Sequence, residues 1–346
     1  MQRFAVLDAF RGLFAMMIVF FHMKDYNWVT DNSFVNNSDL FVNFFFVLSG
    51  FVIAFVYYDR INSGTALFGF VKNRFKRIYP LHLYTLLVFA AFELTKSYLY
   101  RQGYFEHVES SNNTLQSFLA NIFLLNATPA AGGKGLSWNY PSWSISAEFI
   151  TYIFFGLLMY LLRKSRAVKT IVSAAIPLLM IILSRSISSL VFGAVLGFFT
   201  GVIVYRLYRN YQPLKKLNKA AGTLLEAAIF TLTVIMICNK PVFLNCLYVY
   251  CFLFALNIYI FSFELGMISS FLKTRFFQTM GKYSYSIYLN HAIVIEVVNF
   301  LLVRLLKLDG AVLYIVPFII AALTFAYSGL TYRFIEARFY KRHAHK

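Results

Sequence analysis

The sequence predicts an all-α, polytopic membrane protein of about ten transmembrane helices, with both termini in the cytoplasm. Three observations lead to this class. Hydrophobic residues fill 60% of the 346 positions and charged residues only 13%, with a mean hydropathy of +0.65, which is outside the usual soluble range. The apolar residues form runs long enough to cross a hydrocarbon core about 30 Å thick. Most of the 32 lysines and arginines lie in alternate segments between these runs, and the positive-inside rule assigns those segments to the cytoplasm.

Ten apolar runs are the candidate helices. They cover residues 5–23, 40–58, 79–96, 142–162, 167–184, 188–205, 223–239, 242–261, 283–303 and 312–330. We expect residues 1–346 to form one transmembrane domain without an appended soluble domain. A cleavable signal peptide is not expected, because Asp8 and Arg11 interrupt the first run. The net charge of +18 is explained by topology and anionic lipid, so no nucleic acid partner is expected. The three cysteines show no metal-ligand spacing, so no metal is expected.

The first run carries one arginine and one histidine. His22 lies eleven positions after Arg11. At about 100° per residue, the two side chains point to one face of the helix to within roughly 20°, and they lie about 16 Å apart along its axis. Ionisable groups inside spans are costly and by default mark a function. The alternative is that Asp8 pairs locally with Arg11, while His22 anchors the helix at the membrane interface.

The second run and the inner loop that follows it carry two further signals. Ser49 and Gly50 interrupt a phenylalanine-rich run, where small residues either let another backbone approach closely or weaken the helix locally. The predicted inner loop at 59–78 ends with four positively charged residues. Arg74 and Arg77 lie three residues apart on one helical face and can grip phosphates with paired donors. The alternative explanation for these arginines is the positive-inside rule.

The fourth and ninth runs each hold a buried ionisable residue. Glu148 lies about two turns below the outer surface, near the depth expected for His22, so the geometry allows a carboxylate–imidazole pair. His291 is expected about 12 Å from the cytoplasmic side, at the depth of Arg11. The outer loop at 97–141 is rich in small and polar residues and can shape an acceptor site, and its apolar run 115–125 is too short to span and is expected at the interface.

Several of these elements occur together in a fixed order. They are Leu7-Asp8-Ala9-Phe10-Arg11-Gly12 with His22 ten residues later, Phe45-Phe46-Val47-Leu48-Ser49-Gly50-Phe51, Arg74-x-x-Arg77-x-x-Pro80, Trp143-Ser144-Ile145-Ser146-Ala147-Glu148 and Ser286-Ile287-Tyr288-Leu289-Asn290-His291. Over essentially the whole chain, this order resembles the acyltransferase-3 family of membrane O-acyltransferases. Two positions depart from the family pattern: Asn43 stands where an acidic residue is frequent, and Arg338 stands where proline often follows Phe334-Ile335-Glu336.

The resemblance implies a function and a set of site residues. Members move an acyl group, often acetyl from acetyl-coenzyme A, to a hydroxyl of a bacterial surface glycan such as lipopolysaccharide, or of a lipid-linked sugar, at the cytoplasmic (inner) membrane. Acyl-coenzyme A is then a substrate, and no permanently bound cofactor is expected. His22 is the expected general base or transient acyl carrier. The implied groups are His22, Arg11 and Glu148 for catalysis, Arg74, Arg77 and His291 for the donor, and Ser49, Trp143 and Ser144 for the acceptor or for structural support.

Two other classes of protein fit the same charged groups. A transporter or flippase would move a lipid-linked sugar or an acyl-bearing small molecule without turning over acetyl-coenzyme A. A scaffold for a polysaccharide-synthesis complex would use the intramembrane charges only to pair helices, so replacing His22 would affect assembly and not a reaction.

Overall fold

A computed structural model describes residues 3–23, 30–104, 112–183, 190–240, 247–306 and 310–341. The described part of the chain is helical and contains no strand. Its α-helices are α1 Ala5–Phe21, α2 Ser33–Asn36, α3 Phe41–Tyr57, α4 Gly64–Arg101, α5 Leu115–Ile122, α6 Trp143–Leu161, α7 Arg166–Leu183, α8 Leu190–Asn210, α9 Lys219–Cys238, α10 Leu247–Phe261, α11 Met267–Leu272, α12 Arg275–Asn299, α13 Val316–Thr331 and α14 Ala337–Lys341. Short 3₁₀ segments include η3 Tyr140–Ser142, and π-helical segments follow α12 and α13 at Phe300–Leu305 and Tyr332–Glu336.

Each of the ten predicted apolar runs corresponds to a helix. Eight helical segments within the described ranges are long and apolar enough to cross a membrane. The other two are shorter, since α1 has 17 residues and α10 has 15. The all-α, polytopic class is therefore confirmed, and the chain is a multi-pass membrane protein.

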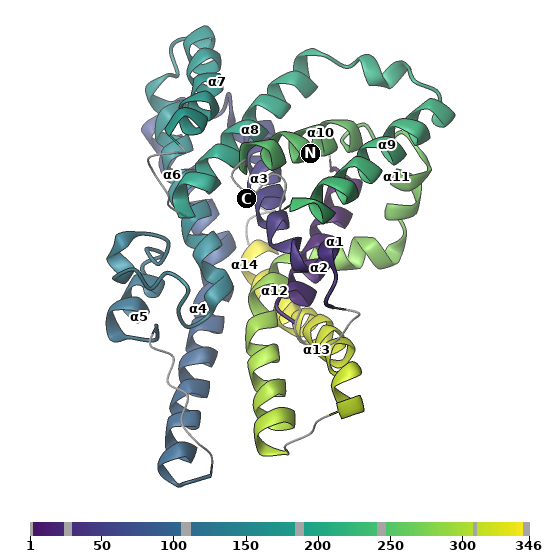
Figure 1. The fold of residues 1–346 in the computed structure, drawn as a ribbon. Helices are drawn as coiled ribbons and strands as arrows, with labels where there is room; N and C mark the ends of the chain where they lie inside the picture. The colour runs from purple at the N-terminus through teal and green to yellow at the C-terminus, as the bar shows by residue number, and fades with distance from the viewer. Residues whose placement is uncertain are drawn as a thin grey trace.

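Helix α4 differs most from the prediction, because the expected inner loop at 59–78 is helical from Gly64 onwards. The Ser63 side chain accepts a hydrogen bond from the Ala66 backbone N–H and caps the helix start. With 38 residues, α4 is about 57 Å long and extends well beyond a hydrocarbon core of about 30 Å. Arg74 and Arg77 therefore lie on a helix that runs along the side of the molecule (Figure 1).

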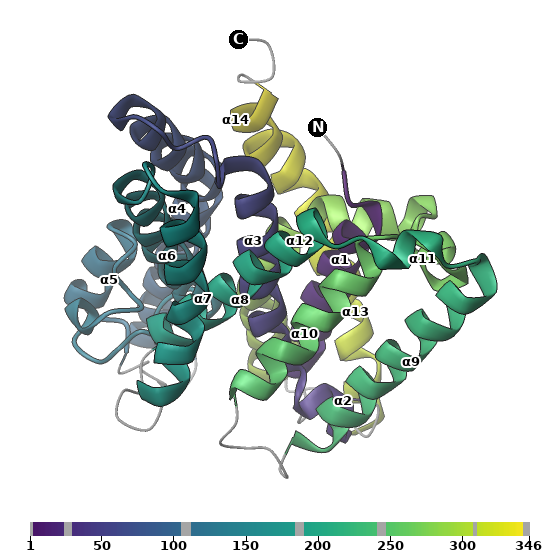
Figure 2. The same ribbon diagram turned by 90° about the horizontal axis from the view of Figure 1, so that it is seen from above.

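The helices are arranged around two closely packed pairs. Helix α3 packs against α8, and α1 packs against α12. Helices α4–α7 lie on one side of these pairs and α9–α11 on the other (Figure 1, Figure 2). Between the pairs the core is aromatic, with the ring of Phe14 in α1 3.9 Å from that of Phe41 and 4.7 Å from that of Phe44 in α3. Such rings contribute large buried areas to the packing of a bundle.

The α3–α8 pair depends on two glycines. A Cβ on Gly50 would overlap the backbone carbonyl of Phe198, and a Cβ on Gly201 would overlap that of Val47. The close backbone approach predicted at Ser49 and Gly50 is thus confirmed.

We expect Gly201→Ala to lower the thermal midpoint of unfolding of the detergent-solubilised protein, because overpacking typically costs about 1–3 kcal/mol. Gly69→Ala is the matched control, since a Cβ at that helical position meets nothing within 4 Å. Alanine has the higher helix propensity, so the control should be neutral or stabilising. Equal melting of both variants would show that the α3–α8 contact tolerates a side chain.

In the predicted outer loop at 97–141, residues 105–111 lie outside the described ranges. The remainder contains α5, which begins with a capping box between Thr114 and Ser117. Leu115, Leu119 and Phe123 of this segment are exposed. An eight-residue helix cannot span a bilayer, and this apolar surface agrees with the position at the interface expected from the sequence.

Candidate functional site

The site is built on α1 and α12, which run parallel and in register. Gly12 packs against the backbone of Met280 and Gly281, and Gly281 packs against the backbone of Asp8. Because neither glycine has a Cβ, the two backbones come close together at this level. Ten residues further along each helix lie His22, which caps the end of α1, and His291. The register set by the glycines therefore brings two histidines to one level.

The imidazoles of His22 and His291 are stacked. Their ring centroids are 5.1 Å apart with an interplanar angle of 25°. The ring of Tyr140, in η3, lies 4.8 Å from that of His22 and 6.2 Å from that of His291. The three rings come from α1, α12 and the segment just before α6, so three separate parts of the chain meet here.

The histidine of α12 is fully buried and has unused hydrogen-bonding capacity. Neither ring nitrogen of His291 has a partner among the residues that the structure describes. The carbonyls of Ile287 and Tyr288, one turn earlier, face the ring without a hydrogen bond of normal geometry. A buried polar group without a partner is costly. Such a group next to a second imidazole is typical of a site that acts on a ligand or on a proton.

The expected depth of His291 is wrong. The apolar run begins at 283, and a helix that starts there would place His291 level with Arg11. Helix α12 begins at Arg275, so His291 is about 24 Å along it and level with His22. Arg11 lies one turn after Asp8 in the N-terminal half of α1, and its guanidinium is 3.6 Å from the Asp8 carboxylate. This contact is the local pair considered as the alternative for Arg11.

Glu148 also lies elsewhere than predicted. Its carboxylate accepts hydrogen bonds from the hydroxyls of Ser49, at 2.6 Å, and Tyr152, at 2.5 Å, and these are its hydrogen bonds in the described part of the chain. The predicted pairing with His22 is replaced by this cluster because Tyr140, which contacts His22, precedes Glu148 by about two helical turns. Glu148 is nevertheless close enough to Tyr288 to interact with it electrostatically.

Hydroxyl groups connect these two levels. Tyr288, one turn before His291 on α12, shares a hydrogen bond of 2.8 Å with the Ser144 hydroxyl. Both hydroxyls also lie within hydrogen-bond distance of the Pro141 carbonyl, at 3.0 Å for Ser144 and 3.2 Å for Tyr288, so one of them donates to that carbonyl and the other to its neighbouring hydroxyl. Trp143 has a different role, because its ring packs 6.2 Å from that of Phe46 and joins α6 to α3. Ser144 therefore borders the polar path, and Trp143 belongs to the apolar packing.

The two arginines of α4 are held differently. Arg77 forms an ion pair with Glu336, whose side chain is 3% exposed, and its guanidinium lies 5.3 Å from the ring centroid of Tyr285. The Arg74 guanidinium lies 5.6 Å from the ring centroid of Tyr57, and its buried Nε atom has no hydrogen-bond partner in the described ranges. Arg74 thus retains donor capacity, whereas Arg77 is already paired with a buried carboxylate.

A family model described as "Acyltransferase domain" matches residues 4–331. The chain belongs to the acyltransferase-3 family. Among curated proteins, 92 residues are 40% identical to "Protein 2 in picA locus" of Rhizobium radiobacter, which is 26% of this chain and 46% of that protein. A second match is 35% identical over 125 residues to "Acyltransferase MdmB" of Streptomyces mycarofaciens, covering 36% of this chain and 29% of that protein. The chain therefore spans less than half the length of either relative. No solved structure matches.

This acyltransferase-3 chain contains site residues that sequence reasoning missed. Tyr140 packs against the two histidines with its ring tilted, and Tyr152 completes the Glu148 cluster. Tyr288 and Glu336 belong to sequence motifs described above, but the sequence predicted no role for either residue. Tyr288 and His291 are three positions apart and therefore lie on one face of the helix. This spacing could have indicated Tyr288 as a site residue. Nothing local in the sequence pairs Glu336 with Arg77, which lies 259 positions earlier.

Proposed function

We propose that this protein is an O-acyltransferase of a bacterial cytoplasmic membrane. The donor is acyl-coenzyme A, with acetyl as the acyl group, and the acceptor is a hydroxyl of a surface glycan or of a lipid-linked sugar. Family membership supports acyl transfer, and the multi-pass fold supports a reaction that links a cytosolic donor to an acceptor at the outer face. The observation that carries the proposal is the His22–His291 stack, because it offers imidazole nitrogens inside a membrane bundle.

The stacked imidazoles supply the base that the reaction needs. Hydroxyl groups have pKa values far above neutrality, so a positioned base assists their attack. His22 accepts the proton of the acceptor hydroxyl while the hydroxyl oxygen bonds to the carbonyl carbon of the thioester. The carbon–sulfur bond then breaks, and the departing coenzyme A thiolate takes the proton from the imidazolium. The buried ring of His291 holds that of His22 in place, so His291 is reassigned from the donor phosphates to this centre.

The donor is held at the opposite end of the path. Arg74 has an unpartnered buried Nε atom on α4, which suits a phosphate oxygen. Glu148 and its two hydroxyl partners link Arg74 to the histidines in this proposal, because Tyr152 is close enough to Arg74, and Tyr288 to Glu148, for electrostatic interaction. These groups offer donors and acceptors to the amides of the pantetheine arm.

Arg74→Lys should weaken donor use by about tenfold in KM for acetyl-coenzyme A, because lysine keeps the charge but loses the planar fork of donors. Arg77→Lys is the comparison variant, since Arg77 is already paired with Glu336 and should affect folding more than KM. Transfer rates measured in membranes over a range of acetyl-coenzyme A concentrations would separate the two. An unchanged KM in Arg74→Lys would indicate that Arg74 does not bind the donor and serves only membrane topology through the positive-inside rule.

Mass spectrometry of surface polysaccharide from deletion and complemented strains tests the proposed function. Loss of an O-linked acyl group on deletion, and its return on complementation, is the expected result. Polysaccharide that keeps its acyl groups but falls in amount would instead support a transporter or a scaffold.

A further inference from the structure

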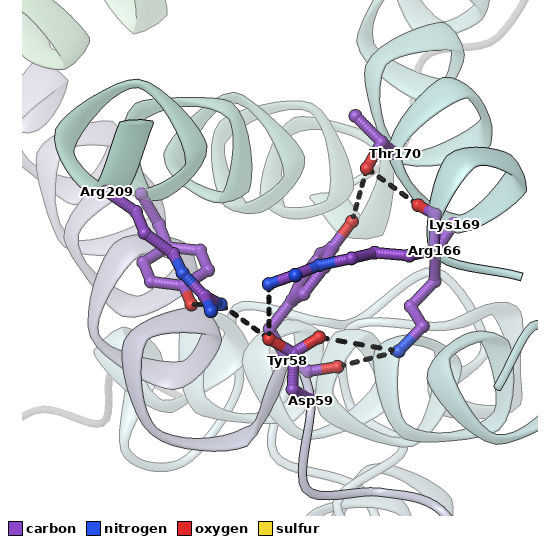
Figure 3. A network of polar contacts seen from close by, with 7 residues as sticks. Tyr58, Asp59, Arg166, Lys169, Thr170 and Arg209 are labelled. Carbon is purple, nitrogen blue, oxygen red and sulfur yellow. Dashed lines mark hydrogen bonds and ion pairs between the residues drawn. The ribbon is translucent and has the colours of Figure 1, made fainter. Parts of the chain in front are cut away.

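A second polar cluster lies at the basic end of the bundle, away from the histidines, where α3 ends, α7 begins and α8 ends (Figure 3). Its carboxylate is Asp59, which accepts hydrogen bonds from Arg209 and, at 3.0 Å, from Arg166. The Lys169 ammonium lies 3.9 Å from the other Asp59 oxygen and donates to the Tyr58 carbonyl. One carboxylate is therefore shared among three cations.

Asp59 supplies a single negative charge to this cluster. Partial burial raises the pKa of its carboxyl, but the hydrogen bond from Arg209 and the charges of Arg166, Arg209 and Lys169 outweigh burial and bring the pKa below its ordinary value. Asp59 therefore stays ionised near neutral pH and brings one negative charge against three positive ones. A further cation adds to this excess of positive charge, which favours an anionic ligand.

Arg206 of α8 is that further cation. Its guanidinium lies 5.3 Å from the ring centroid of Tyr58, and the Lys169 ammonium lies 5.2 Å from the same ring. The Nε atom of Arg206 is buried and has no hydrogen-bond partner in the part of the chain that the structure describes. Arg206 is thus held in place by an aromatic ring, with hydrogen-bonding capacity unused.

Next to Arg206, a groove of about 220 Å³ runs between the first turns of α7 and the last turns of α8. Its lining is mostly apolar and includes Ala174, Val202 and Leu207. Ser173 also lines it; this side chain is 2% exposed, and its hydroxyl has no partner within the described ranges. A guanidinium and a hydroxyl at the edge of an apolar groove match a ligand with an anionic head and an apolar tail.

We propose that this groove binds an anionic phospholipid, with its phosphate at Arg206 and Ser173 and part of an acyl chain between α7 and α8. The excess of cations over carboxylates favours an anionic headgroup. Only 17% of the best apolar window of α7 is buried within the protein, so this helix faces lipid along most of its surface. A soluble anion would use the arginine but not the apolar lining. The proposal does not depend on acyl transfer.

Native mass spectrometry of the full chain, purified in detergent and incubated with phosphatidylglycerol or phosphatidylethanolamine, tests this site. We expect phosphatidylglycerol to be retained and to bind at least about tenfold more tightly than phosphatidylethanolamine. Arg206→Gln should reduce that retention by about tenfold or more, because it removes charge-assisted bonds to the phosphate. Arg163→Gln is the matched control, since Arg163 also stacks on a tyrosine ring, at 4.3 Å from Tyr160, but lies outside the groove.

A second pair of variants tests the groove. Ala174→Leu fills it and should displace the lipid, whereas Ala175→Leu adds the same bulk at an exposed neighbour that does not line it. This pair decides the question if Arg206→Gln does not fold. The proposal is overturned if both phospholipids bind equally, if each variant retains as much lipid as its control, or if glycerol phosphate competes as well as phosphatidylglycerol.

Discussion

His22→Ala should keep normal abundance in the membrane while acyl transfer falls by about 10² or more. Imidazole bases typically contribute 10²–10⁴-fold, and His22 lies at the end of α1 with its ring against those of His291 and Tyr140. The measurement is the initial rate of acyl ester formation on isolated glycan by membranes supplied with acetyl-coenzyme A, normalised to the amount of protein.

A second variant separates chemistry from packing. His22→Phe keeps an aromatic ring against His291 and Tyr140 but has no nitrogen to accept a proton. It should melt like the wild type and be as inactive as His22→Ala. Near-normal transfer by either variant, if well expressed, would show that His22 does not take part in the reaction. His22 would then only anchor α1 at the membrane interface.

Glu336→Gln should destabilise the protein by about 3 kcal/mol, seen as a clear drop in the thermal midpoint of unfolding. The carboxylate of Glu336 is buried against Arg77 and also accepts a hydrogen bond of 2.9 Å from Ser286. Removing one partner of a buried ion pair strands the other charge, which typically costs about 3–5 kcal/mol. The arginine side chain is 23% exposed, so we expect the lower end of that range.

The double variant Arg77→Met with Glu336→Gln provides the control. It removes the stranded charge and should recover part of the lost stability, since replacing a whole buried pair is often nearly neutral. If Glu336→Gln melts like the wild type, the pair contributes nothing to the fold, and Arg77 becomes available for the donor.

The helices and the packing glycine at position 50 could be predicted from the sequence because both are local signals. Runs of apolar residues mark helices directly, and Ser49 with Gly50 marked a close backbone contact that α8 makes. The length of α4 could not be predicted this way. Cations between Lys72 and Arg77 interrupt its first half, and a hydropathy pattern treats that part as a loop although Ser63 caps a helix there.

Depth and pairing between helices were harder to predict. His291 was misplaced because the start of α12 at Arg275 precedes the apolar run at 283. Its contact with His22 depends on the register set by Gly12 and Gly281, which are 269 positions apart in the chain. Glu148 was expected near His22 because both were counted from an assumed outer surface. The hydroxyl groups of Ser49 and Tyr152 instead hold it about two turns away from the histidines.

Transfer of labelled acetyl from acetyl-coenzyme A, supplied outside sealed membrane vesicles, tests the central claim most directly. Inverted vesicles expose the cytoplasmic face, where we expect Arg74 to bind the donor. They should form alkali-labile acetyl ester on glycan inside the vesicles, while right-side-out vesicles and inverted vesicles carrying His22→Ala should not. Ester that forms equally from both faces, or no ester in inverted vesicles that contain folded wild-type protein and acceptor, would contradict the account.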